Sequence, residues 1–71
     1  MADQTSTTVK RALCAEGIKP LGVHRDRGTG WRYVIIRLRP GTVRGTHRRA
    51  EQIASRVMAQ HNFLGEPMAM S

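Results

Sequence analysis

The sequence predicts a small α+β domain, in which an antiparallel β-hairpin or a three-stranded sheet packs on a C-terminal helix. Residues 30–39, GWRYVIIRLR, are the longest apolar-rich run and alternate with the period of two that is typical of a strand. Residues 46–64 instead carry apolar side chains at three- and four-residue spacing, which is typical of a helix with one buried face. A shorter helical pattern over residues 8–16 adds an N-terminal helix.

The length of 71 residues limits the chain to one domain. We expect this domain to span residues 8–65, between a flexible N-terminus over residues 1–7 and a flexible tail over residues 66–71. A chain this short buries a modest fraction of its surface, so a deep, water-excluding active site is hard to build. The length therefore favours a non-enzymatic binding domain without a cofactor over an enzyme.

The first half of the predicted domain contains the short helix and the two strands of a hairpin. Thr8 predicts the helix N-cap, and Gly17, with an apolar residue just beyond it, predicts the helix end. Residues 21–27 alternate and predict the first strand. The glycines that flank Thr29 predict the hairpin connection over residues 27–31, because glycine readily adopts the positive φ of tight turns.

The second predicted strand has two different faces. Its apolar face suits a protein core, because β-branched residues fit a half-buried pleated surface. This face carries Arg32, Val34, Ile36 and Leu38. Its other face combines two polar aromatic rings with two guanidinium groups and suits a binding partner. That face carries Trp31, Tyr33, Ile35, Arg37 and Arg39.

A turn, a short third strand and the long helix follow. Pro40 and Gly41 occupy the two central positions of a type II turn, so residues 42–44 are predicted to return as a short strand. Thr46 predicts the N-cap of the helix, and Gly65 lies beyond its end. We expect the apolar stripe of this helix to cover the apolar face of the second strand. The stripe consists of Ala50, Ile53, Ala54, Val57, Met58 and Leu64.

The composition is strongly basic, because twelve Lys and Arg residues against five Asp and Glu residues give a net charge of +7. Ten of the twelve are arginine, which suits bidentate contacts with phosphate and guanine. Eight arginines lie from Arg25 to Arg49, whereas Asp26 is the only carboxylate in that stretch. This density of like charge predicts a polyanionic partner, with a merely solvated arginine-rich surface as the alternative.

The candidate binding residues combine these arginines with the two aromatic rings. They are Arg25, Arg27, Trp31, Tyr33, Arg37, Arg39, Arg44, Arg48 and Arg49. Arg48 and Arg49 are expected in the first turn of the long helix, where cations oppose the helix dipole unless a phosphate binds there. Trp31 and Tyr33 can stack on bases, but they fit equally well into a second half of the core.

Other kinds of site find little support in the sequence. Cys14, His24, His47 and His61 do not have the short spacing of a structural zinc site, so no metal or catalytic group is expected. A buried helix position is expected for Cys14 instead. The single cysteine fits a reducing compartment, which predicts a cytoplasmic location. No stretch approaches the ~20 apolar residues of a membrane span, so no membrane partner is expected.

Parts of the chain resemble the sheet-plus-helix DNA-binding modules of the plant ethylene-response type and of phage integrase arm-binding domains. The resemblance is carried by Gly22-Val23, Gly30-Trp31, Tyr33, Ile35 and the alanine-bearing helix through Asn62. Because the sheet of these modules enters the major groove, the resemblance implies DNA contacts from Arg25, Arg27, Trp31, Arg32 and Arg37. The helix-sheet-helix order and the RRAEQIA run over residues 48–54 more weakly resemble a double-stranded-RNA-binding domain.

These observations predict a non-enzymatic nucleic-acid-binding regulator, with duplex DNA slightly preferred over RNA. The second hypothesis is a small phage or mobile-element effector that binds a host protein of the nucleic-acid machinery, such as RNA polymerase. Proteins of this kind present acidic grooves, so the same arginines suit either partner. The sequence leaves the oligomeric state open.

Overall fold

The computed structural model describes residues 4–25 and 32–71. Within these ranges the chain forms, in order, α1 (Gln4–Ala15), β1 (Gly22–Arg25), β2 (Tyr33–Arg37), α2 (Arg44–Gln60) and β3 (Glu66–Met70). The predicted hairpin connection over residues 27–31 lies outside the described residues.

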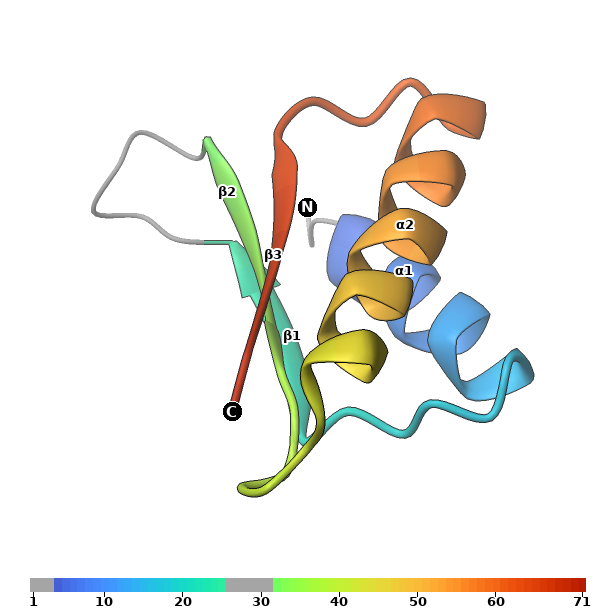
Figure 1. The fold of residues 1–71 in the computed structure, drawn as a ribbon. Helices are drawn as coiled ribbons and strands as arrows, with labels where there is room; N and C mark the ends of the chain where they lie inside the picture. The colour runs from blue at the N-terminus through green and yellow to red at the C-terminus, as the bar shows by residue number, and fades with distance from the viewer. Residues whose placement is uncertain (1–3, 26–31) are drawn as a thin grey trace.

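The three strands form one mixed sheet with β2 in the centre. β1 pairs with β2 in the antiparallel direction that the hairpin pattern predicts, whereas β3 pairs with β2 in parallel. Both helices pack on the same face of the sheet, and neither covers its other face (Figure 1). The predicted class, a small α+β domain, is confirmed.

The core lies between the sheet and the two helices. It consists of Val9, Leu13, Val34, Ile36, Leu38, Ala50, Ile53, Ala54 and Met58. The apolar stripe of α2 thus covers the predicted face of β2. Leu64 is the exception: α2 ends at Gln60, and the Leu64 side chain is 83% exposed in the segment that follows.

α1 begins earlier than predicted. It starts at Gln4 rather than at Thr8, and Thr5 is only 1% exposed. Thr5 lies four residues before Val9 on the buried side of the helix, and Arg25 donates a hydrogen bond of 3.0 Å to its hydroxyl. These tertiary contacts extend the helix past its predicted cap. The predicted flexible N-terminus is therefore wrong for residues 4–7.

The predicted end of α1 is confirmed. Gly17 has a φ of 85°, and the Ile18 N–H donates to the Leu13 carbonyl at 2.9 Å, which is the bonding pattern of a Schellman cap. Cys14 is exposed rather than buried, because the buried side of the helix is formed by Thr5, Val9 and Leu13.

The turn after β2 leads directly into α2. Gly41 has a φ of 86° and the Thr42 N–H donates to the Arg39 carbonyl at 3.2 Å, which confirms the predicted turn. The Thr42 hydroxyl donates to the same carbonyl and holds Thr42 in the turn. The predicted strand over residues 42–44 is therefore wrong, and α2 begins at Arg44 rather than at Thr46.

The third strand is the segment that the sequence predicts as a flexible tail. β3 pairs with β2 over its full length, from Tyr33 opposite Glu66 to Arg37 opposite Met70. A parallel neighbour needs a long crossover connection, and α2 supplies it. The sequence EPMAM has weak strand propensity, so this strand forms because β2 offers an unpaired edge and the helices offer an apolar surface.

A close approach of two backbones sets the start of β3. Gly65 has a φ of 119°, and a Cβ at this position would lie 2.9 Å from the Arg32 carbonyl oxygen. The next residue, Glu66, donates its N–H to that same oxygen at 2.8 Å. A glycine is required here because any side chain would push β3 away from β2.

Candidate functional site

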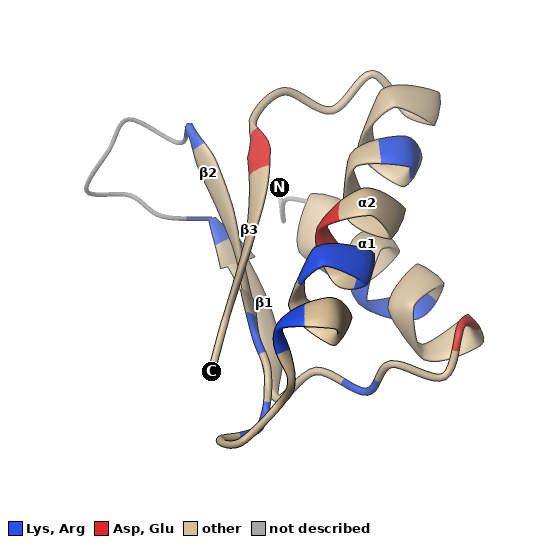
Figure 2. Cartoon of the chain, viewed as in Figure 1, with Lys and Arg blue, Asp and Glu red and all other residues tan. Residues whose placement is uncertain are grey.

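Lys and Arg residues gather at the end of the molecule that contains the 39–42 turn and the first half of α2 (Figure 2). They line two open depressions of about 660 Å³ and 380 Å³, which share Glu16 and Arg49. Arg44 lies one helical turn before Arg48 and extends this surface. We call these cations the α2 basic face. It consists of Lys19, Arg39, Arg44, Arg48, Arg49 and Arg56.

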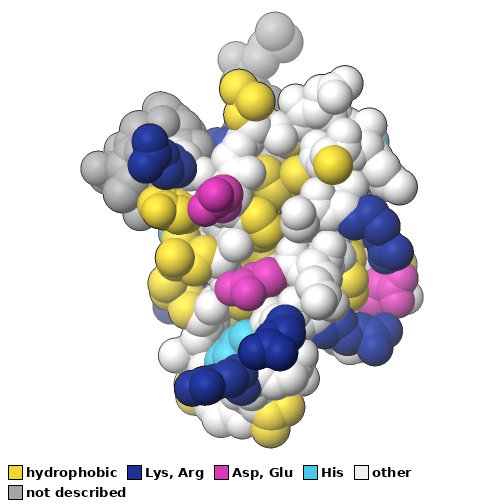
Figure 3. Space-filling model, turned by 45° about the horizontal axis from the view of Figure 1, so that its top comes forward, with side chains coloured by type: hydrophobic (Ala, Val, Ile, Leu, Met, Phe, Trp, Pro, Cys, Tyr) yellow, Lys and Arg dark blue, Asp and Glu magenta, His cyan; other side chains and the backbone are white. Residues whose placement is uncertain are grey.

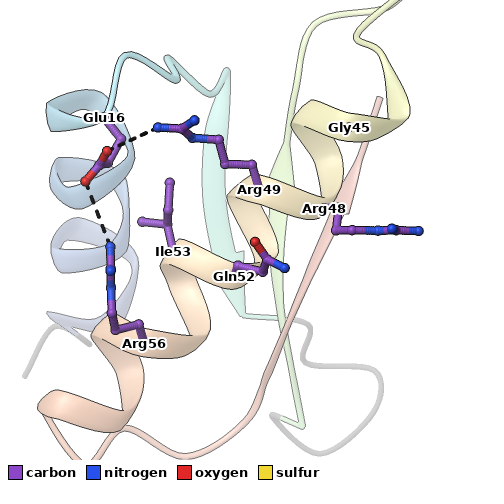
Figure 4. A pocket seen from close by; sticks show the side chains of 7 residues that line it. All are labelled: Glu16, Gly45, Arg48, Arg49, Gln52, Ile53 and Arg56. Carbon is purple, nitrogen blue, oxygen red and sulfur yellow. Dashed lines mark hydrogen bonds and ion pairs between the residues drawn. The ribbon is translucent and has the colours of Figure 1, made fainter.

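The helical period explains why α2 presents these side chains together. Arg48, Gln52 and Arg56 follow one another at four-residue spacing, and Arg49 precedes Gln52 by three residues. Figure 4 shows the Gln52 amide between the arginines, with Arg49 and Arg56 directed toward Glu16 and Arg48 directed away from it. A neutral side chain that both donates and accepts hydrogen bonds thus lies among three guanidinium groups.

Glu16 balances little of this charge. It is the single carboxylate among the described residues that line the two depressions. Its oxygens lie 3.4 Å from an Arg49 nitrogen and 3.9 Å from an Arg56 nitrogen, and these arginine side chains are 61% and 63% exposed. Exposed pairs of this kind contribute ~0–1 kcal/mol to stability. Both arginines can therefore exchange Glu16 for another anion at little cost.

The start of α2 adds unfavourable charge of its own. The N-cap residue Val43 makes no side-chain cap bond, and the first turn contains no acidic residue. Arg44 lies in this turn, where a cation opposes the helix dipole by about 0.3–1 kcal/mol. Arg48 and Arg49 lie one turn later than predicted, because α2 begins at Arg44. Arg44 and Arg48 also repel each other across four residues.

The structure brings together four of the nine predicted binding residues and places three others, Arg25, Tyr33 and Arg37, elsewhere. Arg39, Arg44, Arg48 and Arg49 belong to the α2 basic face. Tyr33 and Arg37 lie on the sheet face that the helices leave uncovered. Arg27 and Trp31 lie outside the described residues. Arg25 points toward the helices.

Arg56 belongs to the α2 basic face but is absent from the predicted site. Its position follows from the helical period, since it lies seven residues after Arg49 and eight after Arg48. The prediction relied on the dense arginine segment that ends at Arg49. Extending the helical pattern of the arginines by two turns would have included Arg56.

Arg25 stabilises the fold. Its guanidinium donates to the Leu64 carbonyl at 2.7 Å and to the Thr5 hydroxyl at 3.0 Å. These bonds join β1 to the segment before β3 and to the start of α1, two regions far apart in the sequence. One guanidinium thus holds together the end of β1, the start of α1 and the segment before β3.

Replacing Arg25 should lower stability without changing partner binding. We expect Arg25→Met to lower the free energy of unfolding by about 1–3 kcal/mol, because two acceptors lose a charged donor. Chemical denaturation followed by circular dichroism measures the change. Arg32→Met, at an exposed arginine just before β2, is the matched control and should leave the unfolding midpoint unchanged. Unaltered stability of Arg25→Met would contradict the structural role.

The second surface is the sheet face opposite the helices, which we call the open sheet face. Strand alternation and register place on it His24, Tyr33, Ile35, Arg37, Glu66, Met68 and Met70. Figure 3 shows hydrophobic side chains gathered along the side of the sheet that is turned away from the helices. Met68 and Met70 are 40% and 45% exposed. Among the residues that the structure describes, this surface combines apolar side chains with one carboxylate and one guanidinium.

Within residues 4–25 and 32–71, no three His, Cys, Asp or Glu side chains are grouped so that they can bind a metal ion. In the same ranges, no helix has the length and apolar character needed to cross a membrane.

Comparisons with known proteins give no match: no family model, curated protein or solved structure is significantly similar to this chain. The resemblances to DNA- and RNA-binding modules therefore stay predictions.

Proposed function

We propose that this protein is a non-enzymatic nucleic-acid-binding regulator that holds the phosphate backbone of duplex DNA with its α2 basic face. The observation that carries the proposal is the gathering of five cations around two adjoining depressions in which, among the described residues, Glu16 is the single carboxylate. Phosphate contacts from arginine and lysine supply most of the affinity of such proteins.

The dimensions of α2 suit a duplex. Arg44 and Arg56 are twelve residues apart, which corresponds to ~18 Å along a helix axis. A helix with side chains is ~10–12 Å wide, which matches the ~12 Å width of the DNA major groove. Arginines at the two ends of the exposed face can then reach phosphates on both sides of the groove.

Gln52 is placed to contact bases. It lies between the arginines on the exposed side of α2, where its amide can donate and accept hydrogen bonds together. A glutamine amide pairs in a bidentate manner with the edge of adenine in the major groove. We assign phosphate binding to the arginines and base contact to Gln52.

The energetics of the surface also favour an anionic partner. Arg44 in the first turn and its repulsion from Arg48 each destabilise α2 by a few tenths of a kcal/mol or more. A phosphate bound near this helix end would reverse the sign of both contributions. The pairs with Glu16 are weak enough to give way to it.

The salt dependence of binding tests the proposal. Fluorescence anisotropy should show binding to a generic DNA duplex at low salt, with log K falling linearly as log[salt] rises. We expect a slope of about −3 to −5, because each phosphate contact contributes about −0.9 and roughly three to six contacts are in reach. Single-stranded DNA and duplex RNA, measured in parallel, should bind more weakly.

Two results would contradict the proposal in different ways. Equal or tighter binding to duplex RNA would mean that the α2 basic face binds nucleic acid but that RNA, and not DNA, is the partner. No binding to any of the three nucleic acids at low salt would overturn the nucleic-acid function. The α2 basic face would then serve an acidic protein surface, as in the hypothesis of a phage or mobile-element effector.

A further inference from the structure

We infer that the open sheet face is a dimer interface, on which a second copy of this chain packs face to face with its strands running in the opposite direction. This inference concerns a surface separate from the α2 basic face and does not depend on what that face binds.

The centre of the open sheet face is apolar. Ile35 on β2 lies beside Met68 on β3 in the sheet register, and Met70 follows Met68 on the same side. Both methionines are nearly half exposed although they belong to a regular strand. Methionine is flexible and adapts to a facing apolar surface. Packing two such faces removes the two methionines from water, whereas Ile35 is only 7% exposed in the single chain and gains little further burial.

Opposite charges lie at diagonally opposite ends of the β2–β3 strand pair, at two positions that we call the charged corners. Glu66 begins β3 beside Tyr33, and Arg37 ends β2 beside Met70. Neighbouring strands are ~4.8 Å apart and residues on one face of a strand are ~7 Å apart, so the two charged groups are separated by about 14 Å along the strands. They are too far apart to pair within one molecule.

A two-fold axis that lies in the plane of the interface, perpendicular to the strands, brings these corners together. The rotation places β2 over β2 and β3 over β3 of the partner, with the strand directions reversed. Arg37 then lies over Tyr33 of the second copy, one strand away from its Glu66. A guanidinium over an aromatic ring beside a carboxylate is favourable. Symmetry produces this contact twice in each dimer.

The edge of the sheet at β3 is protected, which favours packing through the face. The Glu51 carboxylate accepts a hydrogen bond of 3.0 Å from the Ala69 N–H, and the His47 ring lies 3.0 Å from the Ser71 hydroxyl. Both side chains come from α2. They occupy the outer edge of β3, where the strand of another molecule could otherwise pair with it.

The size of the face predicts a reversible dimer. Three strands of about five residues cover ~14 by 17 Å, or roughly 240 Å² per copy, which is below the ~800 Å² per partner of a standard specific interface and corresponds to a weak, transient contact. The dimer would place its two α2 helices on opposite outer sides, because both helices of each copy pack on the far face of its sheet. Dimer formation therefore leaves the α2 basic face accessible.

Sedimentation equilibrium at moderate salt and without nucleic acid tests the inference. We expect the mean mass to rise from 7.9 kDa toward twice that value as the protein concentration increases. Met68→Asp should keep the chain monomeric at the highest concentration, because it places a charge at the apolar centre of the interface. The side chain is exposed in the monomer, so its circular dichroism spectrum should not change.

A charge exchange identifies the orientation of the two copies. Arg37→Glu and Glu66→Arg should each weaken dimerisation by about tenfold or more, because each puts like charges at the corners. The double variant restores opposite charges and should recover most of the association. Arg56→Glu, on the α2 basic face, is the control and should dimerise at least as well as the unmodified protein.

Three results would overturn the inference. The first is a constant mass of 7.9 kDa over the whole concentration range. The second is a dimer that persists in Met68→Asp, which would indicate association through an edge of the sheet. The third is a double variant that dimerises no better than the single ones. None of these results depends on nucleic-acid binding, so the two proposals can fail separately.

Discussion

Removing residues 66–71 is expected to unfold the protein. β3 pairs with β2 along its whole length, and the Leu38 N–H also donates to the Met70 carbonyl at 2.7 Å. Without β3 the central strand becomes an edge, and Ile36 loses its neighbour Ala69 in the core. Several backbone hydrogen bonds at about 1 kcal/mol each, together with the lost burial, approach the whole stability of so small a domain.

Far-UV circular dichroism and one-dimensional proton NMR should show an unfolded spectrum for this truncation. Deleting Ser71 alone is the control, because it removes only the contact with His47 and leaves every residue of β3 in place. A folded spectrum for the six-residue truncation would mean that this segment contributes little, as the sequence prediction of a flexible tail implies.

The sequence was sufficient where local chemistry decides the structure. The stripe of α2 that contains Ala50 and Ile53, the alternation of Val34 and Ile36, and the glycine end of α1 all depend on residues within a few positions of each other. β3 depends instead on an edge provided by residues about thirty positions earlier in the chain. Its own sequence carries little strand signal.

The difference between local and long-range contacts also explains which residues of the candidate site could be predicted from the sequence. Arg44, Arg48 and Arg49 could be grouped from the sequence because one helix carries them. Arg25 could not be separated from them, since its bonds to Leu64 and Thr5 connect positions 39 and 20 residues away. An arginine in a basic segment has the same appearance in the sequence whether it faces a partner or another part of the chain.

Reversing three charges of the α2 basic face is expected to abolish duplex binding while the fold is retained. The variant combines Arg44→Glu, Arg49→Glu and Arg56→Glu. Each contact of an arginine with a phosphate is a charge-assisted hydrogen bond worth about 1.5–3 kcal/mol, so losing three weakens binding by about 1,000-fold or more. Repulsion between the new carboxylates and the phosphates adds to this loss.

The stability of this variant should change little, because two effects oppose each other. A glutamate at position 44 is favourable at the helix N-terminus and pairs with Arg48 four residues later. Replacing Arg49 and Arg56 with glutamate turns their weak attraction to Glu16 into a weak repulsion between exposed carboxylates. Thermal unfolding measures the balance and confirms that the variant is folded before its affinity is interpreted.

A matched control variant distinguishes the effect of charge position on duplex binding from the effect of net charge. Each reversal changes the net charge by two, so three of them take it from +7 to about +1, wherever they lie. The control combines Lys10→Glu, Arg11→Glu and Arg32→Glu, three exposed residues that line neither depression. We expect it to keep most of the duplex affinity and the salt slope of the unmodified protein, since it retains the phosphate contacts. Equal loss of binding in the two variants would show that net charge, and not the α2 basic face, attracts the nucleic acid.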